Sequence, residues 1–130
     1  MSTNAAIALR TGATYQTIYC HWDGHPDTML PMLRENYNTQ ARVIELIGYG
    51  DASSIDKKLE PTPGVAHTFD FPERDVCVFY HRDRGDDWHS CQSVCYTQRS
   101  LFSRMSVEYV YIFADGEWTA YYMNGRKINK

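Results

Sequence analysis

An aromatic hairpin signature near the C-terminal end constrains the fold of this chain more than any other feature. Residues 107–113 and 118–123 are rich in aromatic and β-branched residues, which favour β-strands. Asp115-Gly116 separates the two runs, and this pair suits a type I′ turn because both central positions of that turn take a positive φ. The sequence therefore predicts two antiparallel strands joined by a two-residue turn.

Further strands and a first helix are expected in the N-terminal part of the chain. Residues 5–9 and 15–22 have the pattern of two strands joined by a turn. Residues 27–36 follow with the apolar spacing of a helix. Asp27 is the expected N-cap of this helix, and Pro31 is compatible with it only in the first turn, where no backbone N–H is needed.

A second helix has clearer boundaries. Thr39 is its expected N-cap, and Gly48 is expected to end it. Its apolar stripe consists of Val43, Ile44, Leu46 and Ile47. We expect this helix and the preceding one to cover one face of a sheet.

The pattern after the second helix is less regular. Residues 51–64 are typical of a loop because they are rich in serine and proline. We expect strands at 65–69 and 76–80, an irregular polar stretch at 81–95, a short helix at 97–105 and a frayed basic tail at 126–130. This order predicts a single domain, 1–130, of the α+β class: a largely antiparallel sheet with two helices packed on one face and a C-terminal aromatic hairpin.

Composition and charge exclude several classes of protein. The formal net charge of −3 is too small for a DNA-mimicking decoy and lacks the basic excess of a typical nucleic-acid binder. The N-terminal residues lack the basic and apolar segments of a signal peptide, and no apolar run approaches the length of a membrane span. We therefore expect a cytoplasmic protein with no membrane association, whose four cysteines, Cys20, Cys77, Cys91 and Cys95, are reduced.

The high aromatic content bears on assembly. Aromatic residues make up 14% of the chain and include ten tyrosines. Tyrosine joins an apolar ring to a polar hydroxyl, and an excess of it is typical of sheet surfaces, interfaces and stacking sites. On so short a chain this excess favours an exposed apolar face or edge, and we expect the protein to form a homo-oligomer.

Two stretches that follow expected strands combine histidine and aspartate. In the first, His21, Asp23 and His25 alternate, and on a continuing strand they would share one face. Imidazole and carboxylate ligands suit zinc, iron or manganese, and His89 in the second stretch could complete a site. A metal-dependent phosphodiesterase built on His21, Asp23 and His89 is therefore one alternative. Against it, a glycine and a proline interrupt the first stretch, which is typical of a turn before a helix.

Another stretch, 98–106, favours anion binding because it contains no acid and alternates hydroxyl, guanidinium and apolar side chains. Arginine makes two-pronged contacts with phosphate. We expect Arg99 and Arg104 to hold phosphates, assisted by Arg82 or Arg84. The candidates for the remaining ligand contacts are Phe102, Trp88 and Trp22, which could stack on a base, and Asp23 and Asn124, which could recognise ribose or base edges. A surface helix whose arginines form ion pairs is the alternative without a ligand.

Nothing in the sequence requires catalysis. The chain contains no nucleophile elbow, phosphate-binding loop or dinucleotide fingerprint. Asp86 and Asp87 are adjacent, so in an extended segment they point apart and do not form an acid–base pair. His89 near Cys91 and Cys95 leaves a cysteine nucleophile as a weaker option. We predict a binding protein with no catalytic residue and no cofactor.

Residues 19–26, Tyr-Cys-His-Trp-Asp-Gly-His-Pro, resemble a Tyr-x-His-Trp-Asp-Gly-Tyr-Pro motif of small phage and prophage proteins. Those chains continue with a helix, a Tyr-Asn break, a second helix and a Gly-Asp-x-Ser-Ser stretch, and residues 35–54 follow that order. Residues 80–85 match the family's later Tyr-x-Arg-Asp-Arg-Gly pattern, whereas His25 stands where the family has tyrosine. The resemblance implies a phage-encoded protein that acts in the cytoplasm of an infected bacterium.

Small early phage proteins often act against host immunity. The order of two helices against an antiparallel sheet is similar to that of the Thoeris anti-defence sponges, which bind cyclic ADP-ribose-type signals and, in some members, cyclic oligonucleotides without cleaving them. The resemblance therefore implies a sponge that sequesters a nucleotide-derived immune signal. The alternative from another class is an inhibitor of the anti-CRISPR type, which would contact a host defence protein through the aromatic hairpin and the acidic residues 83–87.

Overall fold

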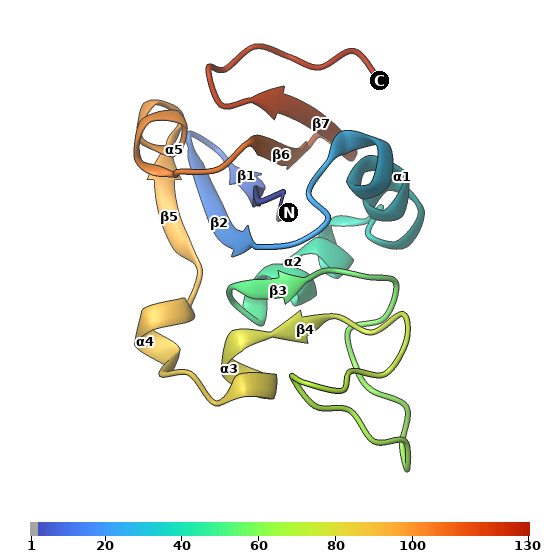
Figure 1. Cartoon of the computed structure of the whole chain (residues 1–130). Coiled ribbons are helices and arrows are strands. Elements are labelled where there is room, and N and C mark those ends of the chain that lie inside the picture. The colour runs from blue at the N-terminus through green and yellow to red at the C-terminus, as the bar shows by residue number, and fades with distance from the viewer. Residues whose placement is uncertain (1–2) are drawn as a thin grey trace.

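The computed structural model describes residues 3–130 and confirms an α+β fold dominated by a mixed sheet (Figure 1). The strand order is β4-β3-β2-β1-β6-β7, and β5 pairs with β2 beside this path. Four of the strand pairs are antiparallel, whereas β1–β6 and β2–β3 are parallel. The elements in chain order are β1 (Ala5–Thr11), β2 (Thr14–Cys20), α1 (Pro26–Asn36), α2 (Gln40–Gly48), β3 (Ala52–Ser54), β4 (Val78–Phe79), α3 (Tyr80–Arg84), α4 (Trp88–Cys91), β5 (Val94–Thr97), α5 (Gln98–Arg104), β6 (Tyr109–Ala114) and β7 (Glu117–Tyr122).

Side-chain alternation along the central strands divides the apolar residues between two faces of the sheet. On one face, Ile7, Ile18 and Tyr111 belong to the larger core, which α1 and α2 complete with Leu33 and Leu46. The two predicted helices therefore share one face of the sheet.

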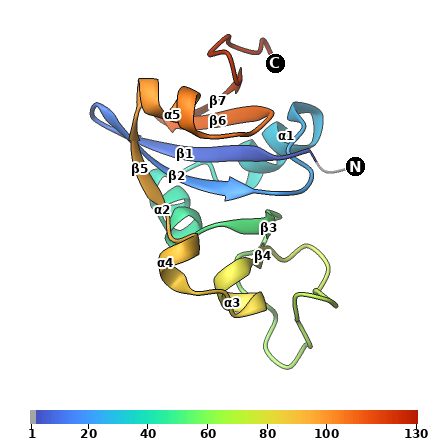
Figure 2. The same ribbon diagram turned by 60° about the vertical axis from the view of Figure 1, so that its left-hand side comes forward.

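The opposite face has a smaller core that α5 closes. Leu101 of α5 is fully buried in the same cluster as Ala8 and Val110. Phe102 packs edge-on against Tyr121 of β7, with 5.7 Å between the ring centroids. Both views show α5 at one end of β5 and α4 at the other (Figures 1 and 2).

The predicted cap of α1 was wrong, whereas the limits of α2 are confirmed. His25 caps α1, because its Nδ1 accepts the N–H of Asp27 at 3.2 Å, and Pro26 takes the first helical position. Pro31 lies inside the helix, beyond its first turn. Burial of apolar side chains such as Leu33 outweighs the one backbone hydrogen bond that proline removes. α2 starts after its N-cap Thr39 and ends at Gly48, as predicted.

The C-terminal hairpin is confirmed. Asp115 and Gly116 have φ values of 53° and 79°, both positive as a type I′ turn requires. The basic tail, however, is not frayed. The N–H of Tyr122 donates to the Arg126 carbonyl at 2.9 Å, and the N–H of Ile128 donates to Ala120 at 2.8 Å. The buried side chain of Ile128 anchors a tail whose sequence is otherwise polar.

Residues 65–69 were wrongly predicted to be a strand, since they belong to the loop between β3 and β4. A turn closes at Thr68 and Phe71: the N–H of Phe71 donates to Thr68 Oγ1 at 2.9 Å, and the N–H of Thr68 donates to the Phe71 carbonyl at 3.3 Å. Val65 is 48% exposed, so the apolar alternation in this segment does not mark a buried face.

The stretch 81–95 was predicted to be irregular, but it contains most of α3, all of α4 and the start of β5. Asp83 supports the first turn of α3, because its Oδ2 accepts the N–H of Phe79 at 2.7 Å, and Gly85 follows the helix with φ 82°. Among the helices of residues 3–130, none combines the length and apolar character that a membrane crossing requires.

Candidate functional site

A pocket of about 520 Å³ lies between the end of α2 and the helices α3 and α4. Its volume falls in the range of small-molecule sites. The residues that line it are Gly48, Tyr49, His81, Arg82 and Trp88. Two of the predicted ligand-binding residues, Arg82 and Trp88, are therefore brought together here.

Aromatic rings and a guanidinium group form one side of this pocket. Tyr49 stacks on Phe79 with 4.7 Å between centroids and 13° between ring planes. The guanidinium carbon of Arg82 lies 5.2 Å from the Tyr49 centroid and 5.0 Å from that of Phe79. Such cation–π contacts stabilise the arrangement and fix the orientation of the Tyr49 ring.

The N–H groups of Arg82 are largely used by the protein itself. Nε donates to Asp83 Oδ1 at 2.9 Å, and Nη2 donates to the Cys77 carbonyl at 2.9 Å and to Asp83 Oδ2 at 3.1 Å. Nη1 donates to the carbonyl of Leu59 and lies 4.0 Å from Glu60. Four of the five donors of the guanidinium are thus occupied, so Arg82 connects the loop 55–77 to α3.

Trp88 and His81 form the opposite side of the pocket. Their rings pack edge-on with 5.1 Å between centroids. His81 Nδ1 lies 2.8 Å from the carbonyl oxygen of Asp86, which can only accept a hydrogen bond. In the neutral imidazole the proton is therefore on Nδ1, and Nε2 remains an acceptor. Among the described residues, no hydrogen-bond partner contacts this Nε2.

Gly50 allows the approach of α4 to the pocket. It has φ +82°, and a Cβ at this position would clash with the Cys91 carbonyl and lie 3.1 Å from the Trp88 ring. The next residue, Asp51, donates its N–H to the same Cys91 carbonyl at 2.7 Å. Only glycine combines this backbone conformation with so close an approach.

The Asp51 carboxylate lies where the edge of β2 changes partner. β2 pairs with β5 over residues 14–17 and with β3 at Cys20. Between these two ladders, Oδ1 of Asp51 accepts the N–H of Tyr19 at 2.8 Å. Burial raises the pKa of Asp51 to about 6, although the hydrogen bond from Tyr19 partly opposes that shift. The carboxylate thus replaces a strand partner next to the pocket.

Arg84 lies beside the pocket but does not line it. Its Nε and Nη2 make a two-pronged ion pair with Asp86, at 2.8 and 2.7 Å. The guanidinium carbon also lies 4.2 Å from the Tyr80 ring centroid and 5.0 Å from that of Phe69. Both arginines of the His81–Asp86 segment therefore have intramolecular partners.

The predicted residues of α5 lie at the far end of β5 from the pocket (Figure 2). Arg99 and Arg104 are exposed and make no hydrogen bond or ion pair with any of residues 3–130. Phe102 is partly buried in the smaller core, where it contacts Tyr121. Within one chain, the structure therefore does not bring the α5 arginines together with Arg82 and Arg84.

The other predicted contacts are dispersed. Trp22 is 43% exposed after the end of β2, next to Asp23, which turns the chain with φ 58°. Asn124 follows β7, at the opposite edge of the sheet from β4, and its Oδ1 accepts the N–H of Arg126 at 2.9 Å. None of these three lines the pocket.

The alternative metal ligands do not form a cluster. His21 Nδ1 lies 2.7 Å from the Tyr19 hydroxyl, Asp23 is exposed in its turn, and His89 is exposed on α4. Within residues 3–130, no three histidine, cysteine, aspartate or glutamate side chains are arranged to hold a metal ion.

The structure contains the four cysteines as free thiols. Cys20, Cys77 and Cys91 are buried, and only Cys95 is exposed. Burial raises the pKa of Cys20 to about 12 and raises that of Cys91 above its ordinary value. A nucleophilic cysteine needs the opposite shift, so Cys91 does not have the setting of a nucleophile.

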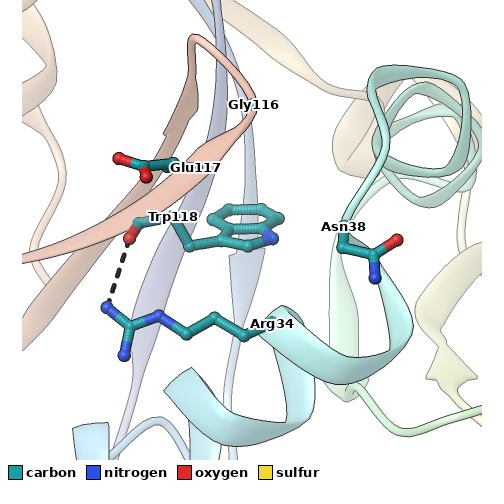
Figure 3. Close-up of a pocket in the computed structure, with 5 residues that line it drawn as sticks. All are labelled: Arg34, Asn38, Gly116, Glu117 and Trp118. Carbon is teal, nitrogen blue, oxygen red and sulfur yellow. Dashed lines mark hydrogen bonds between the residues drawn. The ribbon is translucent and has the colours of Figure 1, made fainter.

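A second pocket of about 340 Å³ lies between α1 and the tip of the β6–β7 hairpin (Figure 3). Arg34 reaches across it, and its Nη2 donates to the Trp118 carbonyl at 3.4 Å and to the Lys130 carbonyl at 2.9 Å. The indole N–H of Trp118 donates to the Tyr37 carbonyl at 2.7 Å. Since Trp118 is only 3% exposed, this pocket offers no aromatic face, and we regard it as the weaker site.

Sequence reasoning missed three residues of the main pocket: Gly48, Tyr49 and His81. Gly48 was assigned only to the end of a helix, and His81 only to a polar stretch. The pocket joins two segments more than thirty positions apart, and no local pattern in either segment predicts that they meet. No family model, curated protein or solved structure matches the chain.

Proposed function

We propose that the protein binds a nucleotide-derived small molecule in the pocket between α2, α3 and α4 and holds it without cleaving it. The observation that carries this proposal is the pocket itself, whose volume of about 520 Å³ suits a nucleotide. Tyr49 and Trp88 supply aromatic surface for stacking, a contact that contributes about 1–3 kcal/mol per base.

The biological role that we propose follows from the resemblance of residues 19–26 and 80–85 to small phage proteins. A phage protein in the cytoplasm of its host could sequester a cyclic ADP-ribose isomer or a cyclic oligonucleotide and so silence an immune response. Such a sponge needs affinity and no turnover. The buried thiols of Cys20, Cys77 and Cys91 agree with binding alone, and so do the dispersed positions of His21, Asp23 and His89.

The test is to mix purified protein with cyclic ADP-ribose isomers and cyclic di- and trinucleotides, measure depletion of free ligand, and then heat the sample to release what was bound. We expect one class to be depleted and recovered intact. Trp88→Leu should abolish capture, whereas Trp22→Leu, which replaces an exposed tryptophan outside the pocket, should not. Recovery of an altered ligand would instead favour a metal-dependent phosphodiesterase. No depletion of any compound would contradict the proposal.

A second candidate function is inhibition of a host defence protein by direct contact, and Phe71 favours it. This side chain is 83% exposed in the loop between β3 and β4. The reciprocal Thr68–Phe71 hydrogen bonds hold the turn in one conformation, and a rigid aromatic side chain is a typical interface anchor. The acidic residues 83–87 suit this role less well, because Asp83 and Asp86 are already paired with arginines.

The two candidates can be separated with matched variants. If a host protein is the target, Phe71→Ser should abolish its co-purification, whereas Trp88→Leu should leave it unchanged. The reverse result would favour the small-molecule function. We also expect a homo-oligomer, and a monomer mass by light scattering at micromolar concentration would count against it.

A further inference from the structure

We infer that the pocket between α2, α3 and α4 recognises the planar base of its ligand, through ring faces and the imidazole of His81, and does not bind phosphate. The inference rests on the proposed function and deepens it by stating which part of a nucleotide the pocket takes. It also gives none of the arginines that the sequence singles out a phosphate-binding role in this pocket.

The first argument is that, among the described residues that line the pocket, no lysine or arginine has its charge unpaired. Arg82 is the only cationic side chain among the lining residues, and four of its five N–H donors are bonded to Leu59, Cys77 and Asp83. A two-pronged contact with phosphate would have to displace the buried Asp83 carboxylate, which is 5% exposed, or a backbone carbonyl, because only one N–H of Arg82, on Nη1, is left and Glu60 lies 4.0 Å from that nitrogen. Each such displacement leaves a buried polar group unsatisfied, which opposes phosphate binding.

The second argument concerns the charges around the pocket. Arg82 is balanced by Asp83, and Arg84 by Asp86. The acidic side chains that remain nearby are Glu60, which lies 4.0 Å from Arg82 without forming a hydrogen bond, Asp51 and Asp87. The local field is therefore neutral to negative, which opposes a phosphate but tolerates a neutral heteroaromatic ring.

The third argument is the chemistry that the walls do offer. Tyr49 and Trp88 present aromatic rings, and the Arg82 guanidinium is a further planar surface. The remaining polar groups of the lining side chains are the Tyr49 hydroxyl, the indole N–H of Trp88 and the imidazole of His81. The Asp86 carbonyl accepts the Nδ1–H of His81, so in the neutral ring Nε2 is an acceptor. A planar ring that carries a hydrogen-bond donor, such as an exocyclic amine, matches this set.

The test compares four probes by isothermal titration calorimetry: adenosine, AMP, purine riboside (which lacks the exocyclic amine) and ribose 5-phosphate. We expect adenosine and AMP to bind within about threefold of each other, and ribose 5-phosphate not to bind. Purine riboside should bind about fivefold more weakly than adenosine, because one neutral hydrogen bond contributes about 1 kcal/mol. Raising NaCl from 50 to 500 mM should change the adenosine affinity less than twofold.

The variant His81→Phe makes the test specific, because it keeps an aromatic ring against Trp88 and removes the acceptor. In this variant adenosine should bind no better than purine riboside, and the affinity for purine riboside should be unchanged. Arg104→Ala, outside the pocket, should leave all four affinities unchanged. A circular dichroism melt would verify that each variant is folded.

The outcomes distinguish the two proposals. Binding of ribose 5-phosphate, or AMP affinity more than tenfold above that of adenosine, would overturn the inference and leave the proposed function standing. Capture of cyclic nucleotides by a protein that binds neither adenosine nor AMP would do the same. If neither these probes nor any cyclic nucleotide binds, the proposed function falls with the inference.

Discussion

His67 Nε2 lies 3.4 Å from Asp83 Oδ1, and the two side chains are only 2% and 5% exposed. The other ring nitrogen of His67, Nδ1, accepts the N–H of Glu73 at 2.9 Å, so in the neutral ring the proton is on Nε2, which is buried and has no hydrogen-bond partner among residues 3–130. The same carboxylate binds Arg82 and the N–H of Phe79. Asp83 therefore joins the loop 55–77 to the start of α3.

Replacing Asp83 should be costly. Asp83→Asn is expected to lower the free energy of unfolding by about 3 kcal/mol at pH 7, because the partly buried guanidinium of Arg82 loses its counter-charge. Burial alone would raise the pKa of Asp83, but hydrogen bonds from Arg82 and Phe79 lower it on balance. The contribution of this carboxylate is therefore present at neutral pH and is lost as pH falls through the lowered pKa. Urea denaturation at pH 7 and pH 3 would measure both effects.

Asp70→Asn, an exposed position in the same loop, should change stability by less than about 0.5 kcal/mol.

Gly50 and Gly64 share a backbone conformation but differ in how closely other atoms approach them. Both have φ +82°, but a Cβ on Gly50 would clash with the Cys91 carbonyl, whereas nothing lies within 4 Å of one on Gly64. Gly64→Ala should cost about 1–2 kcal/mol, the strain of a left-handed residue. Gly50→Ala should cost at least about 2 kcal/mol more, because α4 must also move. Chemical denaturation measures the loss of unfolding free energy in both variants. Equal losses would show that α4 does not restrict the side chain at position 50.

Because of Asp51, the free energy of unfolding should fall as pH rises from about 4 to 6. Its pKa is raised to about 6 by burial, so the native state holds a proton that the unfolded chain, with a carboxyl pKa near 3.8, releases in this window. Asp51→Asn keeps an oxygen acceptor for Tyr19 and removes the titration. The variant should gain stability relative to the wild type between pH 4 and 6 and keep a constant advantage above pH 7. That advantage should not exceed about 2 kcal/mol, after allowance for partial solvent screening. A difference that does not vary with pH would contradict the assignment.

Ile128 should hold the tail on β7. Ile128→Ala is expected to cost about 2 kcal/mol, because the side chain is only 7% exposed. The amide of Tyr122, which donates to Arg126, should then exchange with deuterium faster. Asn129→Ala, at the exposed neighbouring position, serves as the control and should change neither quantity.

Three of the arginines that the sequence singles out should separate into two classes. Arg82→Ala should unfold the protein or destabilise it by more than about 3 kcal/mol, since it leaves the buried Asp83 carboxylate without its counter-charge. Arg99→Ala and Arg104→Ala should each stay within about 0.5 kcal/mol of the wild type, because both side chains are exposed. Thermal melts of the three variants would measure this difference.

Local chemistry explains which parts of the fold could be predicted. Asp115-Gly116 between aromatic runs, and Thr39 and Gly48 at the ends of an apolar stripe, act within a few residues and are decided by backbone sterics and capping. The prediction failed where distant residues decide. The conformation of residues 65–69 depends on the contact between His67 and Asp83. The position of the C-terminal tail depends on Ile128, which lies beside β7.

The candidate site could be predicted only in part for the same reason. The sequence alone does not distinguish the environments of Arg82 and Arg99. In the structure Arg82 donates hydrogen bonds to the backbone carbonyls of Leu59 and Cys77, whereas Arg99 is exposed. Trp88, which the sequence singles out as a stacking residue, lines the pocket, whereas Tyr49 on the same pocket carries no local signal in the sequence.

The tail along β7 also determines how copies of the chain can meet. An outer strand with free N–H and C=O groups is a template on which another chain can add a strand, which is how sheets aggregate. Here residues Arg126 and Ile128 occupy backbone groups of Tyr122 and Ala120, and Arg34 occupies the carbonyl of Trp118. This edge is therefore capped from within the molecule. We expect copies that associate to do so through another surface. Loss of the tail would expose these backbone groups of β7, and a strand of another copy could then pair with them.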